Sequence, residues 1–284
     1  MIPNNFEYTA PTTLKDALAL INNGGKPLAG GMSLIPMMKL RLANPEHLID
    51  LGRIAELNYI RESNGELHIG ANATHYDVEI SPLIMGKCPL LSDTASQIGD
   101  IQVRNRGTLG GSVAHADPSA DYPAALQALE AKIVLTSASG TRTIPTAGFF
   151  IDTFTTALEP GELVTEVIVP IEAGLTGTSY QKFLQPASGF AIVGVAARIR
   201  REAGAITLAR IGVTGVGGNS YRALKAEQAL EGKAGSDAEI AAAAKLTGDG
   251  IEASADLHAS AVYRLHLAAN YAGRAIRAAL SRSV

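Results

Sequence analysis

The chain has 284 residues, a length that favours two or three packed units over one core. It carries 24 Lys and Arg against 27 Asp and Glu, and neither sign gathers into a long block, which argues against a nucleic-acid partner or an anionic membrane surface. The single cysteine, Cys88, excludes an internal disulfide and a cysteine-ligated cluster, so any metal redox centre must lie on another chain.

The N-terminus shows no targeting signal. Residues 1–8 lack a basic stretch followed by an apolar one, and no apolar run approaches the roughly 20 residues of a membrane span. We therefore expect a cytoplasmic protein without membrane insertion.

The first predicted elements surround a glycine pair. Residues 13–22 have apolar side chains at helical spacing, and Asn23-Gly24-Gly25 ends that helix. A short strand at 27–29, a short helix at 34–41 and a strand at 47–51 follow. The pattern predicts a small β-α-β-like unit around a tight turn.

The middle of the chain mixes both kinds of element. Strands are predicted at 67–71, 132–136 and 163–169, and helices at 76–80, 90–97 and 123–131.

Beyond about residue 178 the pattern changes to neighbouring strands followed by helices. Strands are predicted at 191–200 and 206–216, and helices at 237–253 and 260–280. In the last helix an apolar stripe is expected to pack, formed by Val262, Leu265, Ala269, Ala272, Ile276 and Leu280. Its arginines, Arg264, Arg274, Arg277 and Arg282, are expected to face elsewhere.

Two glycine-rich runs are the strongest candidates for a ligand site. Gly30-Gly31 follows a short strand, so consecutive backbone N–H groups and the Ser33 hydroxyl can face an anion. The run from Thr108 to Ser112 repeats the pattern ahead of a helix start at Asp121. One such pair alone is better explained by an ordinary turn, but two matched loops favour a pyrophosphate clamp.

Other chemistries find no support in the sequence. It contains no G-x-G-x-x-G fingerprint, no P-loop and no G-x-S-x-G elbow. His75 and His115 lack ligands at metal spacing and are interpreted as surface or hydrogen-bonding side chains, and Cys88 has no recognisable base. We therefore expect no metal site and no catalytic acid, base or nucleophile.

At the two loops the sequence resembles the FAD-binding medium subunits of the molybdenum hydroxylases, the family of xanthine and carbon monoxide dehydrogenases, and is most similar to the carbon monoxide dehydrogenase type. The resemblance covers nearly the whole chain. Its motifs are Ile2-Pro3, Phe6-Glu7-Tyr8, the runs 28–42 and 104–126, and Glu159-Pro160-Gly161-Glu162-Leu163.

The resemblance implies an α+β fold. Residues 1–176 would form a PCMH-type FAD-binding domain with two α/β subdomains, about 1–54 and 55–176, the second built on a mixed sheet. Residues 177–284 would form a C-terminal domain of a small antiparallel sheet plus a three-helix bundle.

The resemblance also assigns the cofactor contacts. FAD would lie between the first two units, with Asp121 bonded to its sugar or ribityl region, the Leu163 backbone at the isoalloxazine and Lys182 near the flavin. A helix cap for Asp121 and a solvated strand lysine for Lys182 are the alternatives. The pyrophosphate would contact Ala29, Gly30, Gly31, Met32, Ser33, Leu34, Thr108, Gly110, Gly111 and Ser112.

Three positions depart from the family. Met32 stands where histidine is common, Ser112 replaces an asparagine, and Phe190 stands where the carbon monoxide dehydrogenase type has a tyrosine. Because backbone amides can still bind phosphate, we expect both loops to act through amides. These differences argue against assuming carbon monoxide as the substrate.

The implied function is electron transfer within a complex. A large molybdopterin subunit and a small [2Fe–2S] subunit would join this chain, as a dimer of heterotrimers, and electrons would pass through FAD to an external acceptor. Two alternatives remain open: a stand-alone FAD-dependent oxidoreductase with its own substrate pocket, and a non-catalytic nucleotide-binding assembly factor.

Overall fold

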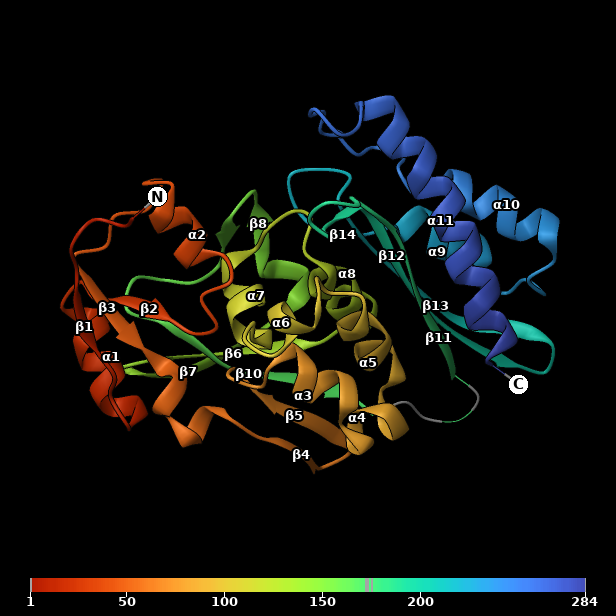
Figure 1. The fold of residues 1–284 in the computed structure, drawn as a ribbon. Coiled ribbons are helices and arrows are strands. Elements are labelled where there is room, and N and C mark those ends of the chain that lie inside the picture. The colour runs from red at the N-terminus through yellow and green to blue at the C-terminus, as the bar shows by residue number, and fades with distance from the viewer. Residues whose placement is uncertain (1, 172–173, 175, 284) are drawn as a thin grey trace.

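The computed structural model describes residues 2–171, 174 and 176–283, and Figure 1 shows three units along the chain. The first is a three-stranded parallel sheet in the order β1-β3-β2, with β1 at Glu7–Thr9, β2 at Lys26–Leu28 and β3 at His47–Asp50. Helix α1 (Leu14–Asn22) connects β1 to β2, and α2 (Leu34–Lys39) connects β2 to β3. The predicted β-α-β unit is thus present, and β1 is an addition to it.

Local chemistry explains α1. The Thr13 hydroxyl accepts a hydrogen bond from the Asp16 amide and caps the first turn. Ala17 and Leu18 point into a small core with Ile49 of β3. Two 3-10 turns, η1 (Leu51–Arg53) and η2 (Ala55–Leu57), lead to the second unit.

The second unit is built on a five-stranded sheet in the order β4-β5-β10-β6-β7. Every neighbouring pair is antiparallel, so the expected mixed sheet is wrong. The sheet type is decided by β10, which lies between β5 and β6 and runs antiparallel to both, whereas the β4–β5 hairpin at Asn64-Gly65, both with positive φ as a primed turn requires, fixes only one edge pair. The strands are β4 (Ile60–Ser63), β5 (Glu66–Gly70), β6 (Lys132–Ser137), β7 (Gly140–Pro145) and β10 (Leu163–Pro170).

Helices cover one face of this sheet (Figure 1). Those at 75–80 and 89–96 agree with prediction, α8 begins two residues before its predicted start, and α4, α6 and α7 were not predicted. The helices are α3 (His75–Ile80), α4 (Pro82–Lys87), α5 (Pro89–Ser96), α6 (Ile101–Arg104), α7 (Leu109–His115) and α8 (Asp121–Ala128). A 3-10 turn η3 (Thr146–Gly148) precedes a small hairpin of β8 (Phe150–Asp152) and β9 (Thr155–Thr156).

The C-terminal domain is an antiparallel sheet in the order β11-β12-β13-β14 with three helices, as expected. One face of the sheet packs on α5 and α8 of the second unit, and the other packs on α9 and α11, with α10 lying against these two helices (Figure 1). The elements are β11 (Thr176–Leu184), β12 (Ala191–Glu202), β13 (Ala205–Thr214), β14 (Tyr221–Arg222), α9 (Leu224–Leu230), α10 (Asp237–Lys245) and α11 (Ala261–Ser281).

Two details of these helices were predicted wrongly. Helix α10 ends at Lys245, well before residue 253, because Gly248 and Gly250 interrupt the following segment. In α11 Val262 is exposed, whereas Arg264 is buried and donates to the carbonyls of Ile192 and Gly215 at 2.7 and 2.5 Å. The apolar stripe is therefore rotated, and one arginine serves as a buried hydrogen-bond donor.

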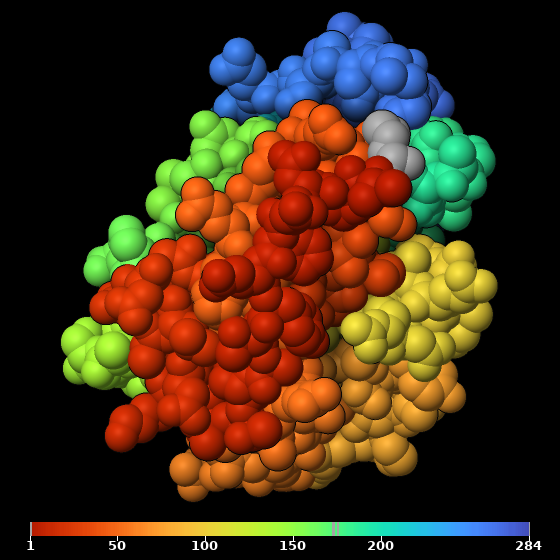
Figure 2. Space-filling model, turned by 60° about the vertical axis from the view of Figure 1, so that its left-hand side comes forward, coloured from red at the N-terminus to blue at the C-terminus, as the bar shows by residue number. Residues whose placement is uncertain are grey.

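The three units are packed against one another. In the space-filling view the N-terminal unit lies over the second unit, and the C-terminal helices form another edge of the molecule (Figure 2). Among the helices of the described residues, none combines the length and apolar character needed to cross a membrane.

Candidate functional site

The first glycine run links β2 to α2 and leaves its amides open. Gly31 has a φ of 75°, a left-handed conformation that glycine adopts without strain. Among the described residues, no hydrogen-bond partner is present for the consecutive amides of Gly30, Gly31, Met32 and Ser33. The Ser33 side chain does not cap α2. Four free amides in a turn form the kind of concavity that holds an anion.

The second run does not form a loop. Thr108 is the N-cap of α7, and Gly110-Gly111 lies in its first turn. The Gly110 amide donates to the Ala71 carbonyl at 2.9 Å, the Gly111 amide to Thr108 Oγ1 at 3.1 Å, and the Ser112 amide to the Thr108 carbonyl at 3.0 Å. The expectation of free amides is therefore wrong for these three residues, because the helix and its neighbours use them.

The two runs nevertheless lie together. A Cβ on Gly30 would lie 2.0 Å from the carbonyl oxygen of Arg106, so only glycine permits this approach. A Cβ on Gly111 would lie 3.7 Å from that of Ala29. Segments about eighty residues apart thus meet, with the free amides on one side and the start of α7 on the other.

Asp121 and Lys182 form a buried pair. The two side chains are 4% and 1% exposed, with Lys182 Nζ 2.9 Å from a carboxylate oxygen. Lys182 Nζ also donates to the Gln97 carbonyl at 2.8 Å, and the Tyr180 hydroxyl donates to Asp121 Oδ1 at 2.5 Å. A solvated Lys182 is therefore wrong, since its ammonium is enclosed at the contact between α5, α8 and β11.

The pKa of the Asp121 carboxyl is raised above its ordinary value. Burial raises the pKa of its carboxyl, while the Lys182 charge and the hydrogen bonds from Tyr180 and Lys182 act in the opposite direction. The pKa of Tyr180 is raised well above its ordinary value by burial and by the adjacent carboxylate, so this phenol stays a donor.

Leu163 and Phe190 differ in exposure. Leu163 is 5% exposed and packs into the core of the N-terminal unit, so its side chain ties β10 to that unit. Its backbone pairs with Thr136 of β6, whereas the described pairing of β10 with β5 begins only at Glu166. Phe190 is 44% exposed and Met32 is 39% exposed, so both side chains are accessible to a ligand.

Sequence reasoning missed the surroundings of the second run. His75 is buried, although it was expected at the surface or in a hydrogen bond, and within the described part of the chain its Nδ1 has no hydrogen-bond partner. A Cβ on Gly107 would lie 2.5 Å from His75 Nε2, so the ring packs directly before Thr108. Burial, together with the Arg104 charge, lowers the pKa of His75 to about 4. No sequence pattern predicted the burial of His75 or the hydrogen bond from Tyr180 to Asp121.

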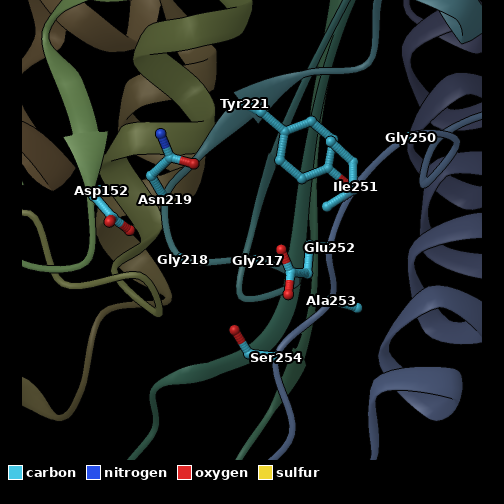
Figure 3. A pocket seen from close by; sticks show the side chains of 10 residues that line it. All are labelled: Asp152, Gly217, Gly218, Asn219, Tyr221, Gly250, Ile251, Glu252, Ala253 and Ser254. Atoms are coloured by element: carbon cyan, nitrogen blue, oxygen red, sulfur yellow. The ribbon is translucent and has the colours of Figure 1, made fainter.

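Figure 3 shows a cavity away from the two runs, between β8 and two loops of the C-terminal domain. Asp152 and Glu252 line it, and its lining contains no lysine or arginine. A cavity with this charge disfavours a phosphate group. Within the described residues, no group of three or more His, Cys, Asp or Glu side chains is arranged to hold a metal ion.

Comparison with known proteins agrees with this geometry. Residues 4–172 match the model of the FAD binding domain in molybdopterin dehydrogenase, and residues 178–279 match that of the CO dehydrogenase flavoprotein C-terminal domain. The chain therefore belongs to the FAD-binding flavoprotein family of the molybdopterin dehydrogenases.

Within that family it is similar to medium chains. It is 41% identical to the carbon monoxide dehydrogenase medium chain of Hydrogenophaga pseudoflava, with 99% of each chain covered, and 37% identical to the glyceraldehyde dehydrogenase medium chain of Sulfolobus acidocaldarius, with 93% and 94% covered. A solved structure of the H. pseudoflava carbon monoxide dehydrogenase matches with a TM-score of 0.97 at 43% identity over 99% of both chains. Quinoline 2-oxidoreductase from Pseudomonas putida 86 matches with 0.94 at 33% identity over the whole of both chains. This chain is the FAD-carrying subunit of a molybdenum hydroxylase-type oxidoreductase.

Proposed function

We propose that the pyrophosphate of FAD binds at the free amides of Gly30 to Ser33, with the start of α7 as the opposite wall. The observation that carries this proposal is the run of four amides without a partner among the described residues. An anion held there would receive charge-assisted hydrogen bonds of roughly 1.5 to 3 kcal/mol each. From there the cofactor would extend toward Leu163, Asp121 and Lys182, the remaining predicted contacts.

The residues of this chain hold and orient the cofactor. When bound, FAD supplies the ability to accept electrons singly and release them in pairs. The single cysteine of the chain cannot ligate iron–sulfur clusters, so electrons would arrive from [2Fe–2S] clusters on a partner chain and leave to an external acceptor. The loops retain the cofactor, and no side chain of this subunit is required to move a proton.

The substrate would be selected on another chain. Relatives named for carbon monoxide, glyceraldehyde and quinoline oxidation are similar to this chain over 90% or more of its length. Because such different substrates accompany one architecture, substrate recognition belongs to the molybdenum chain. We propose a cytoplasmic complex with a large molybdopterin subunit and a small [2Fe–2S] subunit, arranged as a dimer of heterotrimers, with the boundary between this chain's own domains at 176/177.

Titration of the purified chain with FAD, followed by visible absorbance and flavin fluorescence, tests the cofactor site. We expect saturable uptake by the wild type and binding about tenfold weaker or worse in Gly31→Ala, because a side chain at positive φ distorts the amide turn. Gly24→Ala is the matched control, since Gly24 also has a positive φ, of 93°, and open space around its Cα. No uptake by the wild type, or equal affinity of both variants, would overturn the proposal.

Copurification separates the complex from the alternatives. We expect the tagged chain to recover a molybdenum-containing large chain and an iron-containing small chain from its native host. Substrate turnover by the isolated flavin-loaded chain would instead support a stand-alone oxidoreductase.

A further inference from the structure

The turn between α7 and α8, residues 116–120, is held by the C-terminal domain. Thr214 Oγ1 lies 2.7 Å from the Pro118 carbonyl oxygen and 2.8 Å from that of Ala120, so the two carbonyls share its single hydroxyl hydrogen. The Gly215 amide donates to the same Pro118 carbonyl at 2.8 Å, and the Ala191 amide donates to the Ser119 carbonyl at 3.2 Å. Three successive carbonyls of this turn therefore accept hydrogen bonds from the start of β12 and the end of β13.

The start of α8 is fixed in the same way. Asp121 follows the turn directly, and its carboxylate is held by Tyr180 and Lys182 of β11. A Cβ on Gly212 of β13 would lie 1.9 Å from the Ala124 carbonyl oxygen, so the sheet lies directly against α8. This close contact between Gly212 and the Ala124 carbonyl leaves α8 little freedom to move relative to the C-terminal sheet.

The other end of the turn contacts the β8–β9 hairpin. The Phe154 amide donates to the Ala116 carbonyl at 3.2 Å. That hairpin is bound to the C-terminal domain beside the cavity of Figure 3, where Asn219 Nδ2 donates to the Phe150 carbonyl at 2.9 Å and Thr153 Oγ1 donates to the Gly218 carbonyl at 3.0 Å. The turn is thus held directly and through the hairpin.

We propose that the C-terminal domain completes the cofactor site by fixing the turn at 116–120 and, through it, the position of α7, with Thr214 and Tyr180 as positioning residues. This inference rests on the proposed binding of FAD between the two glycine runs. Helix α7 is only seven residues long, with Thr108 at one end and the held turn at the other. A shift of the turn would therefore move the wall that faces the free amides.

Thr214 provides the cleanest perturbation. Its side chain is fully buried, so Thr214→Val keeps the volume but leaves the carbonyls of Pro118 and Ala120 without the hydroxyl donor. Thr247→Val is a matched control, because Thr247 is 1% exposed, lies in the same domain, and its hydroxyl has no hydrogen-bond partner among the residues that the structure describes. Thr214→Ser restores the hydroxyl in a smaller side chain.

The test is FAD titration of the full-length apo chain, with the thermal unfolding midpoint of the apo form and the visible circular dichroism of the bound flavin recorded beside it. We expect the dissociation constant of Thr214→Val to rise about five- to tenfold, with a changed flavin dichroism at saturation, and Thr214→Ser to return toward the wild type. Tyr180→Phe should change the dichroism in the same sense, because it removes one donor to Asp121.

The contrary result is equally specific. If Thr214→Val lowers the midpoint of the apo chain but binds FAD within twofold of Thr247→Val with an unchanged dichroism, Thr214 is only a stability residue and the inference fails. Absence of FAD uptake by the wild type would instead refute the proposed function, so the two failures are distinguishable.

Discussion

Replacing Lys182 by methionine removes one member of an ion pair whose two side chains are 1% and 4% exposed. The Asp121 carboxylate would then stay buried with the Tyr180 hydroxyl as its remaining side-chain donor. Breaking a buried pair from one side costs about 3 to 5 kcal/mol, because the surviving charge has neither water nor a counter-ion. We expect the free energy of unfolding at neutral pH to fall by this amount in urea denaturation.

The loss should depend on pH in a defined direction. Burial already raises the pKa of Asp121, and removing the Lys182 charge raises it further. A carboxyl whose folded-state pKa exceeds its unfolded value takes up its proton on folding. Its contribution to the free energy of unfolding is therefore present below the unfolded pKa and is lost as the pH rises through the folded pKa. The deficit of Lys182→Met relative to wild type should therefore shrink as the pH is lowered from neutrality.

Two further variants make this prediction specific. Lys225→Met breaks an exposed pair, in which Lys225 and Asp249 are 59% and 48% exposed, and should cost about 1 kcal/mol or less. The double variant Lys182→Met with Asp121→Asn removes both charges and should recover much of the loss. A Lys182→Met deficit no larger than that of Lys225→Met, or one that grows on acidification, would refute the reasoning.

Two other buried groups give further expectations. The pKa of His75 is lowered to about 4, so the folded state favours its neutral form. As the pH falls from about 6.5 to about 4, the free energy of unfolding of the wild type in urea melts should fall by about 3 kcal/mol more than that of His75→Gln. Parallel pH profiles of the two proteins would contradict this. Arg264→Met leaves two buried carbonyls without their guanidinium donor and should lower the free energy of unfolding by about 2 to 5 kcal/mol. Arg277→Met changes an arginine on the exposed face of the same helix and should lower it by about 1 kcal/mol or less. Equal losses from the two arginine variants would show that the buried donor has no special role.

Local features of the fold were predictable because their causes lie within a few residues. The helix after Thr13 has its cap, its apolar spacing and its terminating glycines in one short segment. Gly30-Gly31 follows a strand and precedes a helix, and its amides are open as expected. The Asn64-Gly65 turn of the β4–β5 hairpin is equally local, whereas the antiparallel pairing of β10 with β5 and β6 joins distant segments and was not predicted.

The sequence by itself therefore determined the fold class, the family and the open turn at Gly30-Gly31. Tertiary structure decided how the same residue types are used, because hydrogen-bond partners come from distant parts of the chain. The amides of the second glycine run are occupied since Ala71 supplies a carbonyl and Thr108 caps the helix, and no spacing rule shows this. Asp121 and Lys182 lie 61 positions apart, and only the packing of the C-terminal sheet on α5 and α8 excludes water from both and makes each the other's partner.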